Sequence, residues 1–134
     1  MDTLTSYFLA ITAHFCILFC LMWTRSDYVE ASLPPPPFDM KQFADLDGSL
    51  LLCLIIGITL LATEITFVFR QVLSNKLAIF CIFSHALGCV VLLKFVIDLH
   101  IVLHFWLAFI LFSVPPIVIQ LYLFGSSFSK RTCF

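Results

Sequence analysis

The side chains that could do chemistry are few, and they interrupt long apolar stretches of the chain. Glu64 is one of only two charged residues inside such a stretch, while His14, His85 and Gln120 each lie in one of the other three. An ionisable group within a membrane segment is costly and is by default a candidate functional group. These four residues are therefore the first candidates for proton transfer or for a buried polar contact.

Glu64 and His85 lie in consecutive apolar stretches that are joined by a short loop, so their side chains can approach each other. His14 and Gln120 are the further candidate partners. One interpretation is a proton relay or transport site. The other is a polar clasp that fixes the register of the helices. The sequence favours the clasp, because a transport pathway needs more ionisable groups than one acid and scattered histidines.

The same residues could also suggest a metal site, but their spacing does not favour one. Structural zinc takes four ligands and catalytic zinc three, and His14, His85 and Glu64 come from three separate segments. His100 and His104 are four residues apart, yet they lie near one end of the last segment. No nucleophile elbow, phosphate loop or paired-carboxylate motif occurs. We therefore expect no catalytic residue, no metal, no cofactor and no enzymatic activity.

The composition indicates what surrounds these side chains. Of the 134 residues, 62% are hydrophobic and only 11% are charged, and the mean hydropathy is +1.11. A soluble domain is about half apolar and about a quarter charged. With a net charge of −1, the chain also lacks the basic surface that binding to nucleic acid requires. The chain is expected to be an integral membrane protein whose partner is the lipid bilayer, with no nucleic acid.

Four apolar runs are each long enough to cross the hydrocarbon core, which takes about 20 helical residues. They span residues 4–23, 49–69, 77–97 and 101–124. Membrane β-strands would be shorter and would alternate in polarity, which these runs do not. The sequence predicts an all-α membrane protein: one domain over residues 1–134, folded as a four-helix antiparallel transmembrane bundle.

The distribution of charged residues predicts the orientation. Four spans place both termini on one side, and cytosolic loops carry an excess of Lys and Arg. Arg70, Lys76, Lys130 and Arg131 lie on the side of the termini, which we therefore expect to be cytosolic. Residues 24–48 form the expected exoplasmic loop. Its four prolines, 34–37, favour an extended spacer, and Asp47 is expected to cap the helix that starts at Ser49.

Small residues within the runs predict the helix contacts, because helices in lipid associate through small side chains and polar contacts. Ala10 and Ala13 lie on one stripe of the first run, and Gly57 lies on one stripe of the second together with Glu64. Ser84 and Gly88 form a small-xxx-small pair in the third. We expect these residues to face the interior of the bundle.

The fourth run contains the pair Pro115 and Pro116. Proline lacks the N–H group that a helix needs and clashes with the preceding turn, so the pair is expected to kink this helix. The kink could act as a hinge, although a fixed bend that serves packing is the favoured interpretation.

Several short segments, taken in order, resemble the transmembrane protein 107 family. The resemblance rests on the sequence from Ala13 to Ser26, on Ala62-Thr63-Glu64, on Ser84-His85-Ala86, and on Pro115 followed five residues later by Gln120. At the last position the family pattern has an acid, so this chain departs from it there. The resemblance extends over nearly the whole chain in the number of spans and the lengths of the loops.

This resemblance implies a structural membrane protein of the ciliary transition zone, with four spans and cytosolic termini. It implies partners in the Meckel–Joubert module, namely tectonics and other small multi-span proteins. It further implies a contribution to ciliogenesis, to the gate that controls ciliary membrane composition, and to Hedgehog signalling. The alternative function, from the residues alone, is a small transporter or membrane enzyme that uses Glu64, His85 and His14.

Overall fold

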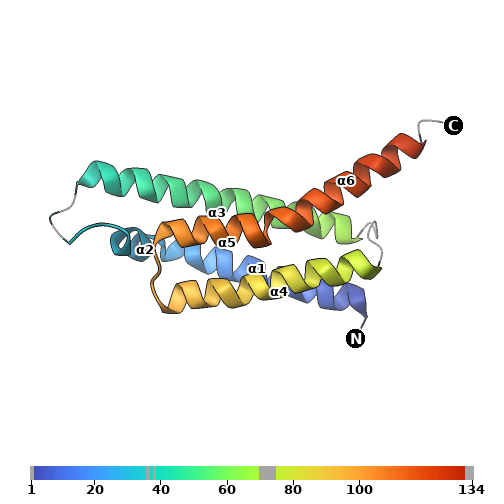
Figure 1. Cartoon of the computed structure of the whole chain (residues 1–134), viewed down its shortest axis with the longest axis horizontal. Helices are drawn as coiled ribbons and strands as arrows, with labels where there is room; N and C mark the ends of the chain where they lie inside the picture. The colour runs from blue at the N-terminus through green and yellow to red at the C-terminus, as the bar shows by residue number, and fades with distance from the viewer. Residues whose placement is uncertain (1, 36, 38, 70–74, 132–134) are drawn as a thin grey trace.

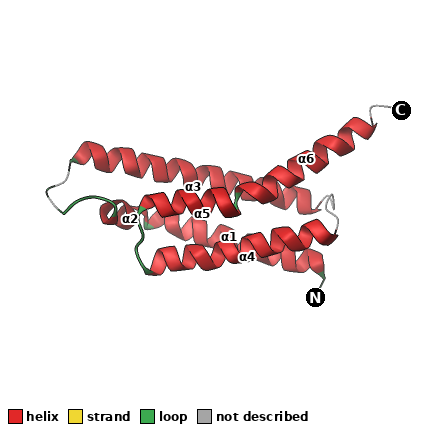
Figure 2. Ribbon diagram, viewed as in Figure 1, coloured by secondary structure: helices red, strands yellow, loops and turns green. Residues whose placement is uncertain are grey.

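The computed structural model of the chain is a bundle of helices (Figures 1 and 2), and it describes residues 2–35, 37, 39–69 and 75–131. No strand occurs among these described residues. The helices are α1 (Thr3–Trp23), α2 (Arg25–Ala31), α3 (Met40–Phe69), α4 (Asn75–Ile97), α5 (Val102–Phe112) and α6 (Val114–Arg131).

Four helical segments are long and apolar enough to cross a membrane: α1, most of α3, α4, and the stretch 102–126 that combines α5 with α6. They run in alternating directions, and α1 begins at the end of the bundle where α6 finishes (Figure 1). The predicted fold class, an all-α membrane protein with four spans, is confirmed. The cytosolic location of the termini stays a prediction. The second predicted loop, 70–76, lies mostly outside the described residues, as does Pro36.

The structure differs from the prediction in the first loop. Residues 24–48 were expected to form one extended exoplasmic loop, but they contain the helix α2 and the first two turns of α3, which begins at Met40. The connection between these helices is limited to residues 32–39. At 30 residues, α3 is about 45 Å long, so it exceeds the roughly 30 Å of a hydrocarbon core. Hydropathy located the membrane-embedded part of this helix and missed its polar extension.

The expected role of Asp47 as a helix cap is also wrong. Asp47 lies inside α3, where its Oδ1 accepts a hydrogen bond of 2.7 Å from Nε of Arg25, at the start of α2. At the true start of α3, Oδ1 of Asp39 accepts a hydrogen bond from the backbone N–H of Lys41 at 3.0 Å. An aspartate at this position satisfies one of the backbone donors that every helix start leaves free.

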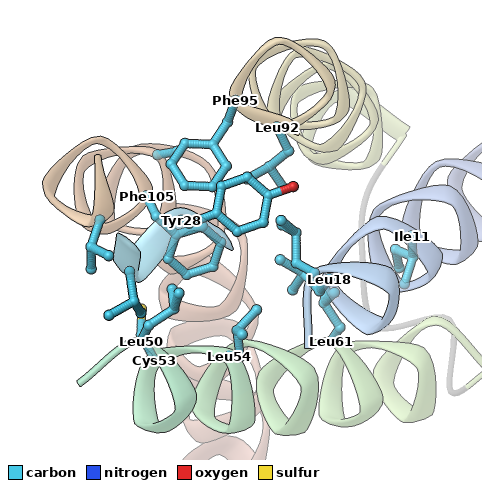
Figure 3. Packing of buried hydrophobic residues seen from close by; sticks show 14 of the residues in the cluster. Ile11, Leu18, Tyr28, Leu50, Cys53, Leu54, Leu61, Leu92, Phe95 and Phe105 are labelled. Atoms are coloured by element: carbon cyan, nitrogen blue, oxygen red, sulfur yellow. The ribbon is translucent and has the colours of Figure 1, made fainter. Parts of the chain in front are cut away.

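An apolar core extends from the end of the bundle that carries α2 to Ile11 of α1 and Leu61 of α3 (Figure 3). The ring of Tyr28 in α2 stacks on Phe95 of α4 at a centroid distance of 4.8 Å, and Phe95 lies 5.7 Å from Phe105 of α5. Leu50 and Leu54 of α3 are buried beside them. The short helix α2 thus closes one end of the bundle.

Candidate functional site

Four polar side chains, one from each span, meet inside the bundle. They are Glu64 of α3, His85 of α4, His14 of α1 and Gln120 of α6, and none of the four is more than 1% exposed. The sequence predicted these residues as a set, and the structure brings all of them together. Tyr7 of α1, which is 2% exposed, is a fifth member that the sequence reasoning missed.

The carboxyl group of Glu64 is the centre of this cluster. Its Oε1 accepts a hydrogen bond from the Tyr7 hydroxyl at 3.1 Å and one from Nε2 of Gln120 at 2.7 Å. Nε2 of His85 lies 3.3 Å from Oε1 and 3.2 Å from Oε2. Nε2 of Gln120 also donates to the Tyr7 hydroxyl. Glu64 therefore contacts side chains from all three of the other spans.

The two histidines extend the cluster along the bundle. Nδ1 of His14 lies 3.1 Å from Nδ1 of His85, and the two rings meet edge to face at a centroid distance of 5.4 Å. One of these nitrogens must donate and the other accept, so the proton positions on the two rings depend on each other. The polar contacts thus form one chain that runs from His14 through His85 and Glu64 to Tyr7.

The cluster is closed by apolar side chains beyond His14. The gap beside it is lined mostly by apolar groups and leaves no room for a water molecule: Leu18 of α1, Gly88 and Leu92 of α4, Phe105 and other apolar side chains of α5, and one polar residue, Ser113. In the described part of the chain, the polar contacts therefore reach His14 and are followed there by packed apolar groups. This arrangement suits a polar clasp inside the membrane.

The burial of the cluster explains which helix faces point inward. Tyr7 and His14 are seven residues apart, so they share one face of α1 with the buried residues Ile11, Leu18 and Leu21. Exposing a tyrosine hydroxyl and an imidazole to lipid would cost more than exposing alanine methyl groups, because only the interior offers hydrogen-bond partners.

One predicted packing stripe is therefore wrong. Ala13 was expected to face the bundle, but it is exposed, and Ala10 is only half-buried. The buried face of α1 lies one residue further along the helix than predicted. Small residues mark a helix contact only when no stronger polar preference sets the rotation of the helix.

The two predicted glycines lie at close approaches between helices. A methyl group added at Gly88 would lie 3.0 Å from Cβ of Phe112 and 3.2 Å from Cε1 of His14. One added at Gly57 would lie 3.2 Å from Cδ1 of Leu18. Gly88 thus allows α4 to approach both α5 and the histidine of the cluster.

The fourth span is divided at the predicted proline pair. Helix α5 ends at Phe112, and α6 begins at Val114, directly before Pro115 and Pro116. Pro116 cannot donate to the carbonyl of Phe112, which is four residues earlier. The hydroxyl of Ser84 in α4 donates to this carbonyl instead, at 3.2 Å. Ser84 was predicted only as a small packing residue, and its hydrogen bond to the kink was not foreseen.

A metal-binding role finds no support in the geometry. Among the described residues, no group of three or more His, Cys, Asp and Glu side chains could hold a metal ion. His100 and His104 lie in edge-to-face contact at 5.1 Å, and Nε2 of His100 lies 3.6 Å from Oδ2 of Asp98. This pair is near the other end of the bundle and does not join the cluster.

The matches to known proteins cover almost the same residues as the four spans. A model of the family TMEM107, described as "Transmembrane protein", matches residues 3–124. A protein of Danio rerio named "Transmembrane protein 107" is 28% identical over 118 residues, which cover 87% of this chain and 87% of that protein. No solved structure matches the chain. The family match includes all four spans and every member of the polar cluster, and the chain accordingly belongs to the transmembrane protein 107 family.

Proposed function

We propose that the protein is a structural membrane component of the ciliary transition zone. In this role it supports ciliogenesis and the gate that controls which proteins enter the ciliary membrane, and through that gate it affects Hedgehog signalling. Its partners are tectonics and other small multi-span proteins of the Meckel–Joubert module. Membership of the transmembrane protein 107 family supports this proposal.

The observation that carries the proposal is the closed polar cluster. It joins one residue from each span through contacts of Glu64, and its members are fully buried. A carboxyl group held in this way fixes the relative positions of the helices. While these contacts are made, the outer surface, which would contact partners in the plane of the membrane, keeps one shape.

The proposed orientation places both termini in the cytosol and α2 on the exoplasmic side. The basic residues of the chain support it, since Lys76, Lys130 and Arg131 belong to the end of the bundle where α1 begins and α6 finishes. Cytosolic segments carry such an excess of Lys and Arg. Partners on both sides of the membrane would then meet different surfaces, the helix α2 on one side and the two termini on the other.

Imaging in ciliated cells tests the location. The protein carries a C-terminal tag and is imaged beside markers of the basal body and of the axoneme. We expect a ring confined to the ciliary base. A distribution over the endoplasmic reticulum or the plasma membrane, with no enrichment at that base, would refute the proposed role and leave the four-span fold intact.

Co-purification tests the assembly. We expect the tagged protein to retain tectonics and small multi-span proteins from ciliated cells, and Gly88→Leu to lose them, because the close approach at this glycine shapes the bundle. Gly125→Leu is the matched control, since nothing lies within 4 Å of the added Cβ position there. If Gly88→Leu retained the same partners as the unchanged protein, the proposed link between bundle shape and assembly would be wrong.

A second candidate function is a small transporter or membrane enzyme that uses Glu64, His85 and His14. The specific observation in its favour is the continuous chain of contacts from His14 to Glu64, because adjacent imidazole and carboxyl groups can pass a proton. The apolar packing beyond His14 argues against it. A pH-dependent flux in liposomes that is lost in Glu64→Gln would establish this function, whereas liposomes that remain sealed with the unchanged protein would exclude proton transport.

A further inference from the structure

The second half of the fourth span is joined to the first half by a weakened helix. In an α-helix each N–H group donates to the carbonyl four residues earlier. Pro115 and Pro116 have no N–H group, so the carbonyls of Leu111 and Phe112 lose their usual donors. The hydroxyl of Ser84 replaces one of these donors and ties the end of α5 to α4. The joint therefore fixes α5 more firmly than it fixes α6.

Beyond this joint, α6 has a short inner face. Pro116, Ile117 and Gln120 are its buried residues, and from residue 121 to residue 126 no side chain is fully buried. In this last part the half-buried ring of Phe124 lies 5.3 Å from that of Phe67 in α3. Leu121 is 52% exposed and Tyr122 is 76% exposed. Figure 1 shows the corresponding arrangement, in which α6 leaves the bundle at an angle to α5 and rises away from α4.

Gln120 makes the polar connection between α6 and the rest of the bundle. Its Nε2 donates to Oε1 of Glu64 at 2.7 Å and to the hydroxyl of Tyr7. Its Oε1 is buried and has no hydrogen-bond partner among the described residues, whereas the Oε2 of Glu64 lies 3.2 Å from Nε2 of His85. A buried acceptor without a donor costs free energy. The docked position of α6 is thus held by the two hydrogen bonds that Gln120 donates, while the carbonyl oxygen of the same side chain stays unsatisfied.

We propose that α6 is a hinged arm that pivots at 113–116 and is latched to the bundle by Gln120. In the latched position Gln120 contacts Glu64 and Tyr7. In the released position α6 moves away, while α1, α3, α4 and α5 keep their places because the apolar core that joins them contains no described residue of α6. Ser84 is the positioning residue of the pivot, since it holds the last carbonyl of α5. This inference does not depend on the proposed cellular role.

The test measures the position of α6 in the full-length protein, reconstituted in lipid nanodiscs. Spin labels are attached to p-acetylphenylalanine, which leaves the native cysteines unmodified, and distances are measured by double electron–electron resonance. The pair Ile79 and Tyr122 reports on the arm, and the pair Ile79 and Leu103 reports on the bundle. All three positions are at least 50% exposed, so the labels do not disturb the core.

We expect Gln120→Leu to widen and shift the distance distribution of the arm pair and to leave that of the bundle pair unchanged. Leu121→Ala, at the neighbouring exposed position, is the control and is expected to change neither. Gln120→Asn is a milder second variant, because its amide is one methylene too short to reach Glu64, and it should release the arm in the same way.

Two results would overturn the proposal. In the first, both Gln120 variants leave the arm pair unchanged, which would mean that the apolar contacts of α6 suffice to hold it. In the second, both variants alter the bundle pair together with the arm pair, which would mean that Gln120 stabilises the whole bundle and not a separate arm.

Discussion

Glu64 collects more polar contacts than any other residue described in the bundle. Tyr7, His85 and Gln120 all place a polar atom within 3.3 Å of its Oε1. Each of these groups is buried, so a loss of the carboxyl group would leave Tyr7 and His85 without this acceptor and Gln120 with the Tyr7 hydroxyl alone. Among the polar residues of the cluster, Glu64 should therefore be the one to which the stability of the bundle is most sensitive.

We predict that Glu64→Leu lowers the free energy of unfolding by about 2 kcal/mol, taking about 0.6 kcal/mol for each of three lost polar contacts within a membrane. Glu64→Gln should cost less, because its amide keeps a carbonyl acceptor and the shape of the side chain. Unfolding in detergent micelles measures both variants. Thr63→Leu, at the adjacent exposed position of α3, is the control, and an equal effect of all three substitutions would contradict the prediction.

Gly88 is the second position where one residue decides the packing. An added methyl group would lie 3.0 Å from Cβ of Phe112, an atom next to the backbone of α5 that a side-chain rotation cannot move away. We predict that Gly88→Leu destabilises the bundle by about 1–3 kcal/mol, the usual range for overpacking a filled interior. Thermal unfolding compared with Gly125→Leu measures this effect. Equal melting temperatures for the two variants would show that α4 can move away from α5 at little cost.

At the scale of elements, an ion pair and a set of buried apolar contacts help to hold α2 on the bundle, and their magnitudes differ. Arg25 and Asp47 form an ion pair whose side chains are 37% and 23% exposed, and partly exposed pairs contribute about 0.2–1 kcal/mol. Tyr28 and Val29 are 3% and 0% exposed. Truncating a large buried aromatic side chain costs about 3–5 kcal/mol. The apolar contacts of α2 should therefore outweigh its ion pair.

This comparison gives a prediction for local opening. We expect Tyr28→Ala to accelerate hydrogen exchange of the α2 amides strongly, and Asp47→Ala to accelerate it only slightly. Ser26→Ala, at an exposed position of α2, should have no effect. Faster exchange in Asp47→Ala than in Tyr28→Ala would show that the ion pair, and not the buried aromatic ring, holds this helix in place.

The elements also show what the sequence could and could not predict. The apolar run 4–23 differs by one residue from α1, and the run 77–97 by two residues from α4. The start of α3 at Met40 was missed, because hydropathy reports where a helix is buried in lipid and not where it begins. The rotation of α1 was missed because its inner face was placed by the small residues Ala10 and Ala13, whereas the hydroxyl of Tyr7 needed a partner.

For the whole molecule, the set of polar residues was more predictable than their contacts. Large polar side chains are rare in these segments, so Glu64, His85, His14 and Gln120 stand out. Because exposing them to lipid is costly, they are expected to meet in the interior of the bundle. Tyr7 did not stand out, since its ring resembles the apolar residues around it. The hydrogen bond of Ser84 to Phe112 depends on how α4 crosses the kink, and only the three-dimensional packing reveals it.

The orientation of the whole molecule gives the last prediction. Short cytosolic segments carry the excess of Lys and Arg, and Arg70, Lys76, Lys130 and Arg131 all belong to the side of the termini. Epitope tags are placed at each terminus and, in a third version, between Pro34 and Pro35 in the connection from α2 to α3. In cells that display the protein on the plasma membrane, antibodies should reach the third tag without permeabilisation and the terminal tags only after it. The opposite pattern would place α2 in the cytosol. It would show that the acidic residues of the first loop, which the count of Lys and Arg leaves out, determine the orientation.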